Sequence, residues 1–102
     1  MLHFSKDGFD KALSQGKLMM VDFWADWCGP CRMLGPVIEQ LADRYPDVVV
    51  GKVNVDDEQE LALRYGVMSI PTVIFFKDGK EIDRKVGVMP PEAFTRVLDD
   101  NK

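Results

Sequence analysis

Cys28 and Cys31 are separated by Gly29-Pro30 and preceded by Trp27, and they are the only cysteines in the chain. Helical periodicity in the residues that follow predicts that both thiols lie in the first turn of a helix. Side chains three positions apart on a helix have Cβ atoms roughly 5–6 Å apart, and a disulfide tolerates such a separation. The spacing therefore predicts a pair that switches between dithiol and disulfide with little backbone movement.

We expect the two sulfurs to differ in reactivity. Cys28 lies where unpaired backbone N–H groups and the positive end of the helix dipole stabilise a thiolate, which lowers its pKa and makes it the attacking group. Cys31 lies one turn further in, where desolvation favours the neutral thiol. Such a pair supports thiol–disulfide exchange, in which Cys28 attacks a target disulfide and Cys31 then displaces the reduced target. This chemistry requires neither a metal nor an organic cofactor.

A half zinc site and a structural cross-link are the alternatives for the cysteine pair. His3 is the only histidine, so one chain cannot supply the four cysteine and histidine ligands of an ordinary zinc site. Two cysteines are also too few for a disulfide framework. A Cys-x-x-Cys segment beside a strand–helix–strand pattern is instead typical of redox proteins. We therefore expect a redox pair and no metal.

The elements that must position this pair alternate along the chain. The apolar segment 18–25 predicts a strand buried on both faces, and the helical spacing of apolar residues over 34–45 predicts the helix after the cysteines. Asp78-Gly79 predicts an antiparallel hairpin between the last two strands. Asp57 and Glu60 form a candidate capping box for a short helix. We expect an α/β fold, with strands at 2–4, 18–25, 48–55, 72–76 and 81–86 in a mixed five-stranded sheet flanked by four helices.

Composition limits the class of protein. The 102 residues, 46% of them hydrophobic and 29% charged, predict one globular domain over 1–102. A net charge of −4 argues against nucleic-acid and anionic-lipid partners. No apolar run approaches the roughly 20 residues of a membrane-spanning helix, and charges stand where a secretory signal needs an apolar core. We expect a cytoplasmic monomer with no membrane partner.

The chain resembles the thioredoxin family over nearly its whole length. The resemblance rests on segments 21–25, 27–32, 52–56 and 70–72, and on Pro36, Gly79 and Gly87 at family spacings. It implies the thioredoxin fold and a general protein-disulfide reductase that maintains redox homeostasis and is recharged by thioredoxin reductase. Gly29-Pro30 is similar to the reducing branch of the family, because oxidases and isomerases with this fold usually carry a histidine before the second cysteine.

The resemblance also implies roles for an aspartate and a lysine. Asp22 shares a strand face with Met20 and Trp24, so we expect a desolvated carboxyl with a raised pKa, unless it reaches solvent at the strand end. The resemblance makes Asp22 the proton acceptor for Cys31. From its pattern alone, Lys52 is an outward-facing strand lysine, whereas the resemblance implies that it pairs with Asp22. We expect Trp24 to belong to the core rather than to the site.

A loop and an apolar surface complete the expected site. Pro71 can simply begin a strand, but Ile70-Pro71-Thr72 resembles the cis-proline loop that faces the cysteines and presents the Ile70 backbone to substrate. We expect a small apolar surface around Cys28 that suits flexible client segments. This surface, called the docking rim below, comprises Trp27, Gly29, Pro30, Val67, Ile70, Pro71, Gly87 and Val88.

Two other functions stay open at this point. The chain can be a binding module whose cysteines are idle, although the presence of Cys28, Cys31 and Asp22 together argues against that. It can also be a net oxidase or isomerase, which equilibration with glutathione distinguishes from a reductase.

Overall fold

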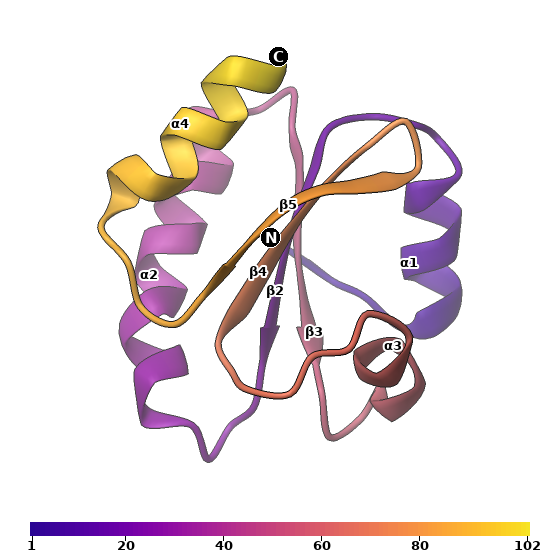
Figure 1. Cartoon of the computed structure of the whole chain (residues 1–102), viewed down its shortest axis with the longest axis vertical. Coiled ribbons are helices and arrows are strands. Elements are labelled where there is room, and N and C mark those ends of the chain that lie inside the picture. The colour runs from indigo at the N-terminus through magenta and orange to yellow at the C-terminus, as the bar shows by residue number, and fades with distance from the viewer.

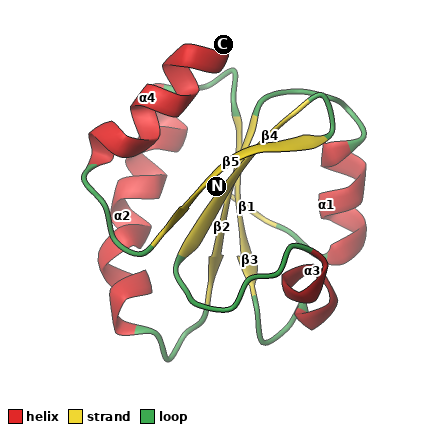
Figure 2. Ribbon diagram, viewed as in Figure 1, coloured by secondary structure: helices red, strands yellow, loops and turns green.

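A computed structural model describes all 102 residues as one five-stranded sheet with helices on both of its faces (Figures 1 and 2). None of the helices is long and apolar enough to cross a membrane. The predicted α/β class and the order βαβαβαββα are confirmed. The elements are β1 (Leu2–His3), α1 (Lys6–Leu13), β2 (Met19–Trp24), α2 (Gly29–Arg44), β3 (Val49–Asn54), α3 (Gln59–Arg64), β4 (Thr72–Lys77), β5 (Lys80–Val86) and α4 (Pro91–Asn101).

The sheet has the strand order β1-β3-β2-β4-β5, with β2 at its centre. β3 is parallel to β1 and β2, because the helical crossovers return the chain to the same end of the sheet. β4 is antiparallel to β2, and β5 is antiparallel to β4. The predicted hairpin turn has positive φ angles of 54° at Asp78 and 77° at Gly79, which is the conformation of a type I′ turn.

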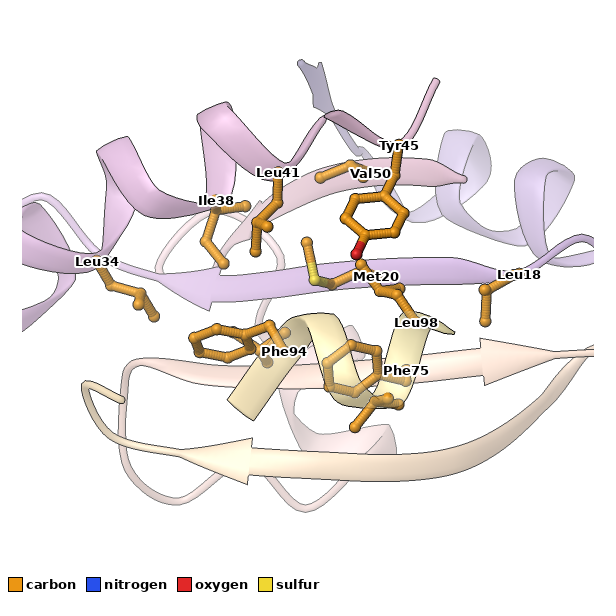
Figure 3. Close-up of a cluster of buried hydrophobic side chains, with 12 residues drawn as sticks. Leu18, Met20, Leu34, Ile38, Leu41, Tyr45, Val50, Phe75, Phe94 and Leu98 are labelled. Atoms are coloured by element: carbon orange, nitrogen blue, oxygen red, sulfur yellow. The ribbon is translucent and has the colours of Figure 1, made fainter. Parts of the chain in front are cut away.

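The helices form two layers, with α2 and α4 on one face of the sheet and α1 and α3 on the other (Figure 1). Successive residues of β2 point to opposite faces, so Met20 packs with the α2/α4 layer while Met19 and Val21 pack with the α1/α3 layer. Figure 3 shows side chains of α2 and α4 meeting Met20 and Phe75 over the sheet. Both faces of β2 are thus buried, as its apolar sequence predicts.

The start of α3 differs from the prediction. The helix begins at Gln59 after Glu58, and no side chain caps it, so the capping box of Asp57 and Glu60 is wrong. The Glu58 carboxylate instead accepts the backbone N–H of Lys6 at 2.5 Å. The Glu58 side chain is thus bonded to the first residue of α1, a partner 52 residues away that local spacing does not indicate.

Candidate active site

Cys28 and Cys31 form a disulfide where the chain leaves β2 and enters α2. Cys28 is the N-cap residue of α2, and its Sγ accepts the backbone N–H of Cys31 at 3.2 Å. The two Cα atoms are 5.3 Å apart. Pro30 lies in the first turn, where its missing N–H costs no hydrogen bond. The helix start therefore directs both a backbone donor and the positive end of the helix dipole at the sulfur of Cys28.

Burial does not distinguish the two cysteines. Cys31 lies inside the first turn of α2 as expected, but the exposed fractions of 5% for Cys28 and 3% for Cys31 are almost equal in the disulfide form. The bond holds both side chains in one small cluster with Ala25. The polar surroundings do differ, because the carbonyl oxygen of Ile70 lies 3.8 Å from Sγ of Cys28. The asymmetry of the pair therefore lies in the groups around Cys28.

Asp22 is fully buried in β2, and neither of its carboxylate oxygens has a hydrogen-bond partner. Burial raises the pKa of this carboxyl from 3.8 to about 6, while the charge of Lys52 acts in the opposite direction. The predicted desolvated carboxyl is confirmed, and the alternative that it reaches solvent is wrong. A carboxyl with this pKa is ionised at neutral pH and still takes up a proton readily.

Lys52 is the direct neighbour of Asp22 across the parallel β2–β3 pair. Its Nζ lies 4.1 Å from the centre of the Trp24 ring, and no ion pair joins it to Asp22. Lys52 therefore forms no direct ion pair with Asp22, although its charge lowers the pKa of that carboxyl as expected. Trp24 itself is half-buried and packs against the cysteine cluster, so it belongs to the site as well as to the core.

The Ile70–Pro71 peptide bond is cis, as the resemblance implies. Pro71 is buried, and its carbonyl accepts the N–H of Gly87 at 2.8 Å, which joins two segments of the docking rim. Neither backbone group of Ile70 is bonded to the backbone of the chain. The cis-proline loop thus holds an unpaired peptide group beside Cys28.

The docking rim varies in exposure. Trp27 and Val88 are the most open of its large side chains, at 67% and 46%. Pro30 is exposed, while Pro71 is buried and contributes only through its backbone. The start of α2 and the segment between α3 and β4 lie at the same end of the molecule in Figure 1. The remaining rim residues, Gly29, Val67, Ile70 and Gly87, are half-buried.

Trp27 is oriented by Asp56, a residue to which the sequence assigned no role. The indole Nε1 donates a hydrogen bond of 2.8 Å to Oδ2 of Asp56. The Asp56 N–H is in turn bonded to Oδ1 of Asn54 at 2.9 Å. The signal was available, because parallel strands end at the same edge of the sheet and residues after β3 must approach residues after β2.

Metal-binding side chains do not gather at this site, since no group of three or more His, Cys, Asp or Glu residues is placed to hold an ion. A cleft of about 280 Å³ is lined in part by Trp24 and Lys52. The larger cavity, of about 730 Å³, is lined by residues around the C-terminal end of α2, such as Tyr45 and Pro46, and not by either cysteine.

Known proteins resemble this chain along its whole length. The thioredoxin family model matches residues 1–100. The thioredoxin of Chlamydia caviae is 46% identical over 97 residues, covering 95% of this chain and 94% of that protein. The X-ray structure of Fasciola hepatica thioredoxin has a TM-score of 0.93 at 38% identity, and all of both chains is covered. The chain therefore belongs to the thioredoxin family, as a protein-disulfide reductase that works through Cys28 and Cys31.

Proposed function

We propose that Cys28 and Cys31 reduce client proteins in two exchange steps. The Cys28 thiolate attacks one sulfur of a client disulfide, forming a mixed disulfide and releasing the other client sulfur as a thiolate. Cys31 then attacks Sγ of Cys28, which frees the second client sulfur and closes the Cys28–Cys31 bond. The client gains two electrons, and the protein loses them. The observation that carries this order is the position of Cys28 at the N-cap of α2, with the Cys31 N–H directed at its sulfur.

Asp22 assists the second step as a general base. Cys31 must lose its proton before it attacks, and Asp22 is a buried carboxylate without hydrogen-bond partners whose proton affinity suits that transfer. The proposal is supported by the pKa of about 6, because such a group is ionised at neutral pH. The resolving step should therefore slow as the pH falls below about 6.

Clients dock in an extended form on the docking rim. The unpaired peptide group of Ile70 beside Cys28 suits the addition of a short client strand through backbone hydrogen bonds. Trp27 and Val88 offer apolar surface that recognises no particular side chain. This combination supports reduction of many clients rather than one.

The remaining expectations rest on membership of the family. Thioredoxin reductase is the proposed electron donor, and no further cofactor takes part. We place the protein in the cytoplasm as a monomer that carries electrons to client proteins. We treat residues 1–102 as one domain, which is supported by the single sheet that both helical layers share.

The test is a coupled assay with thioredoxin reductase, NADPH and a protein disulfide such as insulin. The parent protein should sustain NADPH oxidation. Cys28→Ser should abolish turnover, while Cys31→Ser should accumulate a mixed disulfide with the client that denaturing electrophoresis without reductant detects. Unchanged turnover in either variant overturns the mechanism.

A further inference from the structure

Lys52 is placed to neutralise Asp22 and does not do so. The two residues are paired across β2 and β3, so both side chains leave the sheet on the same face. Asp22 is fully buried with both oxygens unpartnered, which makes it a strong attractor for a cation. The ammonium of Lys52 nevertheless forms no ion pair with Asp22 or with any other carboxylate. The Lys52 ammonium therefore has a contact other than a carboxylate.

The indole ring of Trp24 is the group that holds this ammonium. Trp24 lies two residues beyond Asp22 on the same face of β2, and Nζ of Lys52 lies over its ring at 4.1 Å from the centre. Tryptophan is the best aromatic partner for a cation, and the attraction grows when the pair is partly removed from water. Both residues are half-buried, so this condition is met.

α2 also approaches the ammonium of Lys52. A Cβ added to Gly35 would lie 3.9 Å from Nζ of Lys52, so the helix passes over the lysine at the one position of its buried face that lacks a side chain. The ammonium therefore lies close to both the indole and α2, and Trp24 and Lys52 both line the small cleft.

We propose that Trp24 is a positioning residue whose indole face holds the Lys52 ammonium and keeps it out of contact with the Asp22 carboxylate. This inference rests on the role proposed above for Asp22. An ion pair with Lys52 would stabilise the ionised carboxylate and make it a weaker proton acceptor for Cys31. At its present distance, the ammonium lowers the proton affinity of Asp22 only in part.

No other charged group faces Asp22. Its neighbour on β4 is Val73, and the buried residues of α2 are apolar apart from Cys31. Lys52 on β3 is the one charge that acts on its titration. The titration of Asp22 therefore reports the position of the Lys52 ammonium.

The experiment measures that titration by carbon NMR of the Asp22 carboxyl in the disulfide form of the full chain. Trp24→Leu removes the aromatic face and frees the ammonium. We expect the midpoint for Asp22 to fall by about one pH unit or more, which is the effect of an adjacent opposite charge. Trp24→Phe keeps a weaker aromatic face and should give a smaller fall.

Lys52→Met supplies the matched control. In that background, Trp24→Leu has no ammonium to release, so it should leave the Asp22 midpoint unchanged relative to Lys52→Met alone. A purely structural effect of losing the indole would persist in both backgrounds. If circular dichroism shows that Trp24→Leu is unfolded, the same comparison is made with Trp24→Phe, in the parent and in the Lys52→Met background.

An Asp22 midpoint that stays at the parent value in the Trp24 variants overturns the proposal, as does a fall that persists with Lys52→Met. These outcomes are independent of catalysis, because the disulfide form is titrated without client. A separate experiment tests the proposed role of Asp22 as a general base. If an Asp22→Asn variant resolves mixed disulfides at the parent rate near neutral pH, that role is refuted. The two failures are therefore distinguishable.

Discussion

Asp22 carries a cost in stability. A buried carboxyl without hydrogen-bond partners is tolerated when neutral and is unfavourable when ionised. Its pKa is raised from 3.8 to about 6, so the neutral form is favoured by folding. The stability that this preference contributes is fully present below the unfolded pKa and is lost as the pH rises through about 6. The group proposed to assist catalysis therefore weakens the fold at neutral pH.

Replacing Asp22 by Asn should remove this penalty. A shift of about two pH units corresponds to about 3 kcal/mol, so at about pH 8 the oxidised variant should be more stable than the parent by up to that amount. The gain should shrink toward zero near about pH 4, where the parent carboxyl is neutral. Urea unfolding of both proteins across this range measures the difference. A difference that does not vary with pH contradicts the account.

Asp56 should matter for client binding through Trp27. Asp56→Ala removes the acceptor of the indole hydrogen bond and frees a ring that is 67% exposed. We expect KM for a protein disulfide to rise about two- to fivefold, as the loss of one ordinary hydrogen bond allows, with kcat almost unchanged. The neighbouring Asp57→Ala is the control, because its side chain is exposed and holds no indole. Equal effects of the two substitutions would refute this role.

At the scale of elements, the site is built from segments that adjoin the ends of three strands, β2, β3 and β4, at the same end of the sheet. β2 leads into the N-cap of α2, and β3 leads into the segment that holds Trp27. The segment before β4 brings the Ile70 carbonyl to Cys28. Each contributing strand must therefore keep its position against its neighbours for the site to form.

Gly51 is a position in β3 where the packing leaves no room for a side chain. A Cβ at Gly51 would overlap the ring of Phe4, which packs edge-on against Phe9. Gly51→Ala should therefore lower the free energy of unfolding by about 1–3 kcal/mol, the usual cost of overpacking. Gly29→Ala is the matched control, because its Cβ would meet nothing within 4 Å. Denaturant unfolding compares them, and equal stability of the two variants argues against the account.

At the scale of the whole molecule, one sheet separates two hydrophobic clusters. Ile74 packs with the α1/α3 layer, and the adjacent Phe75 packs with the α2/α4 layer (Figure 3). Five ion pairs also join surface residues, and their side chains are 29–68% exposed. Exposed pairs contribute little, so the two clusters supply most of the stability.

Substitutions on the two faces of β4 should therefore act on a single unfolding transition. Ile74→Ala and Phe75→Ala should each cost about 2–5 kcal/mol, because each leaves a cavity in a fully buried cluster. Far-ultraviolet circular dichroism and tryptophan fluorescence should report the same midpoint in both variants. Separate midpoints would mean that the layers unfold independently and that residues 1–102 are not one domain.

Much of this architecture is predictable because it is encoded locally. The apolar run of β2, the periodicity of α2 and the Asp78-Gly79 turn each determine a nearby conformation. The burial of Asp22 also follows from its strand face. The position of Lys52 does not follow, because an indole and a carboxylate on the same face both attract an ammonium and only the packed geometry decides between them. The bond from Lys6 to Glu58 is likewise invisible locally, since 52 residues separate the pair.

The most direct test of the central claim is the pH dependence of iodoacetamide alkylation of the reduced protein, with the modified residue identified by mass spectrometry. If the start of α2 stabilises a thiolate at Cys28, alkylation occurs there first, with an apparent pKa well below the value of about 8.5 for a free thiol. Cys31 should react far more slowly. Equal and slow alkylation of both cysteines, with an ordinary thiol pKa, would contradict the account.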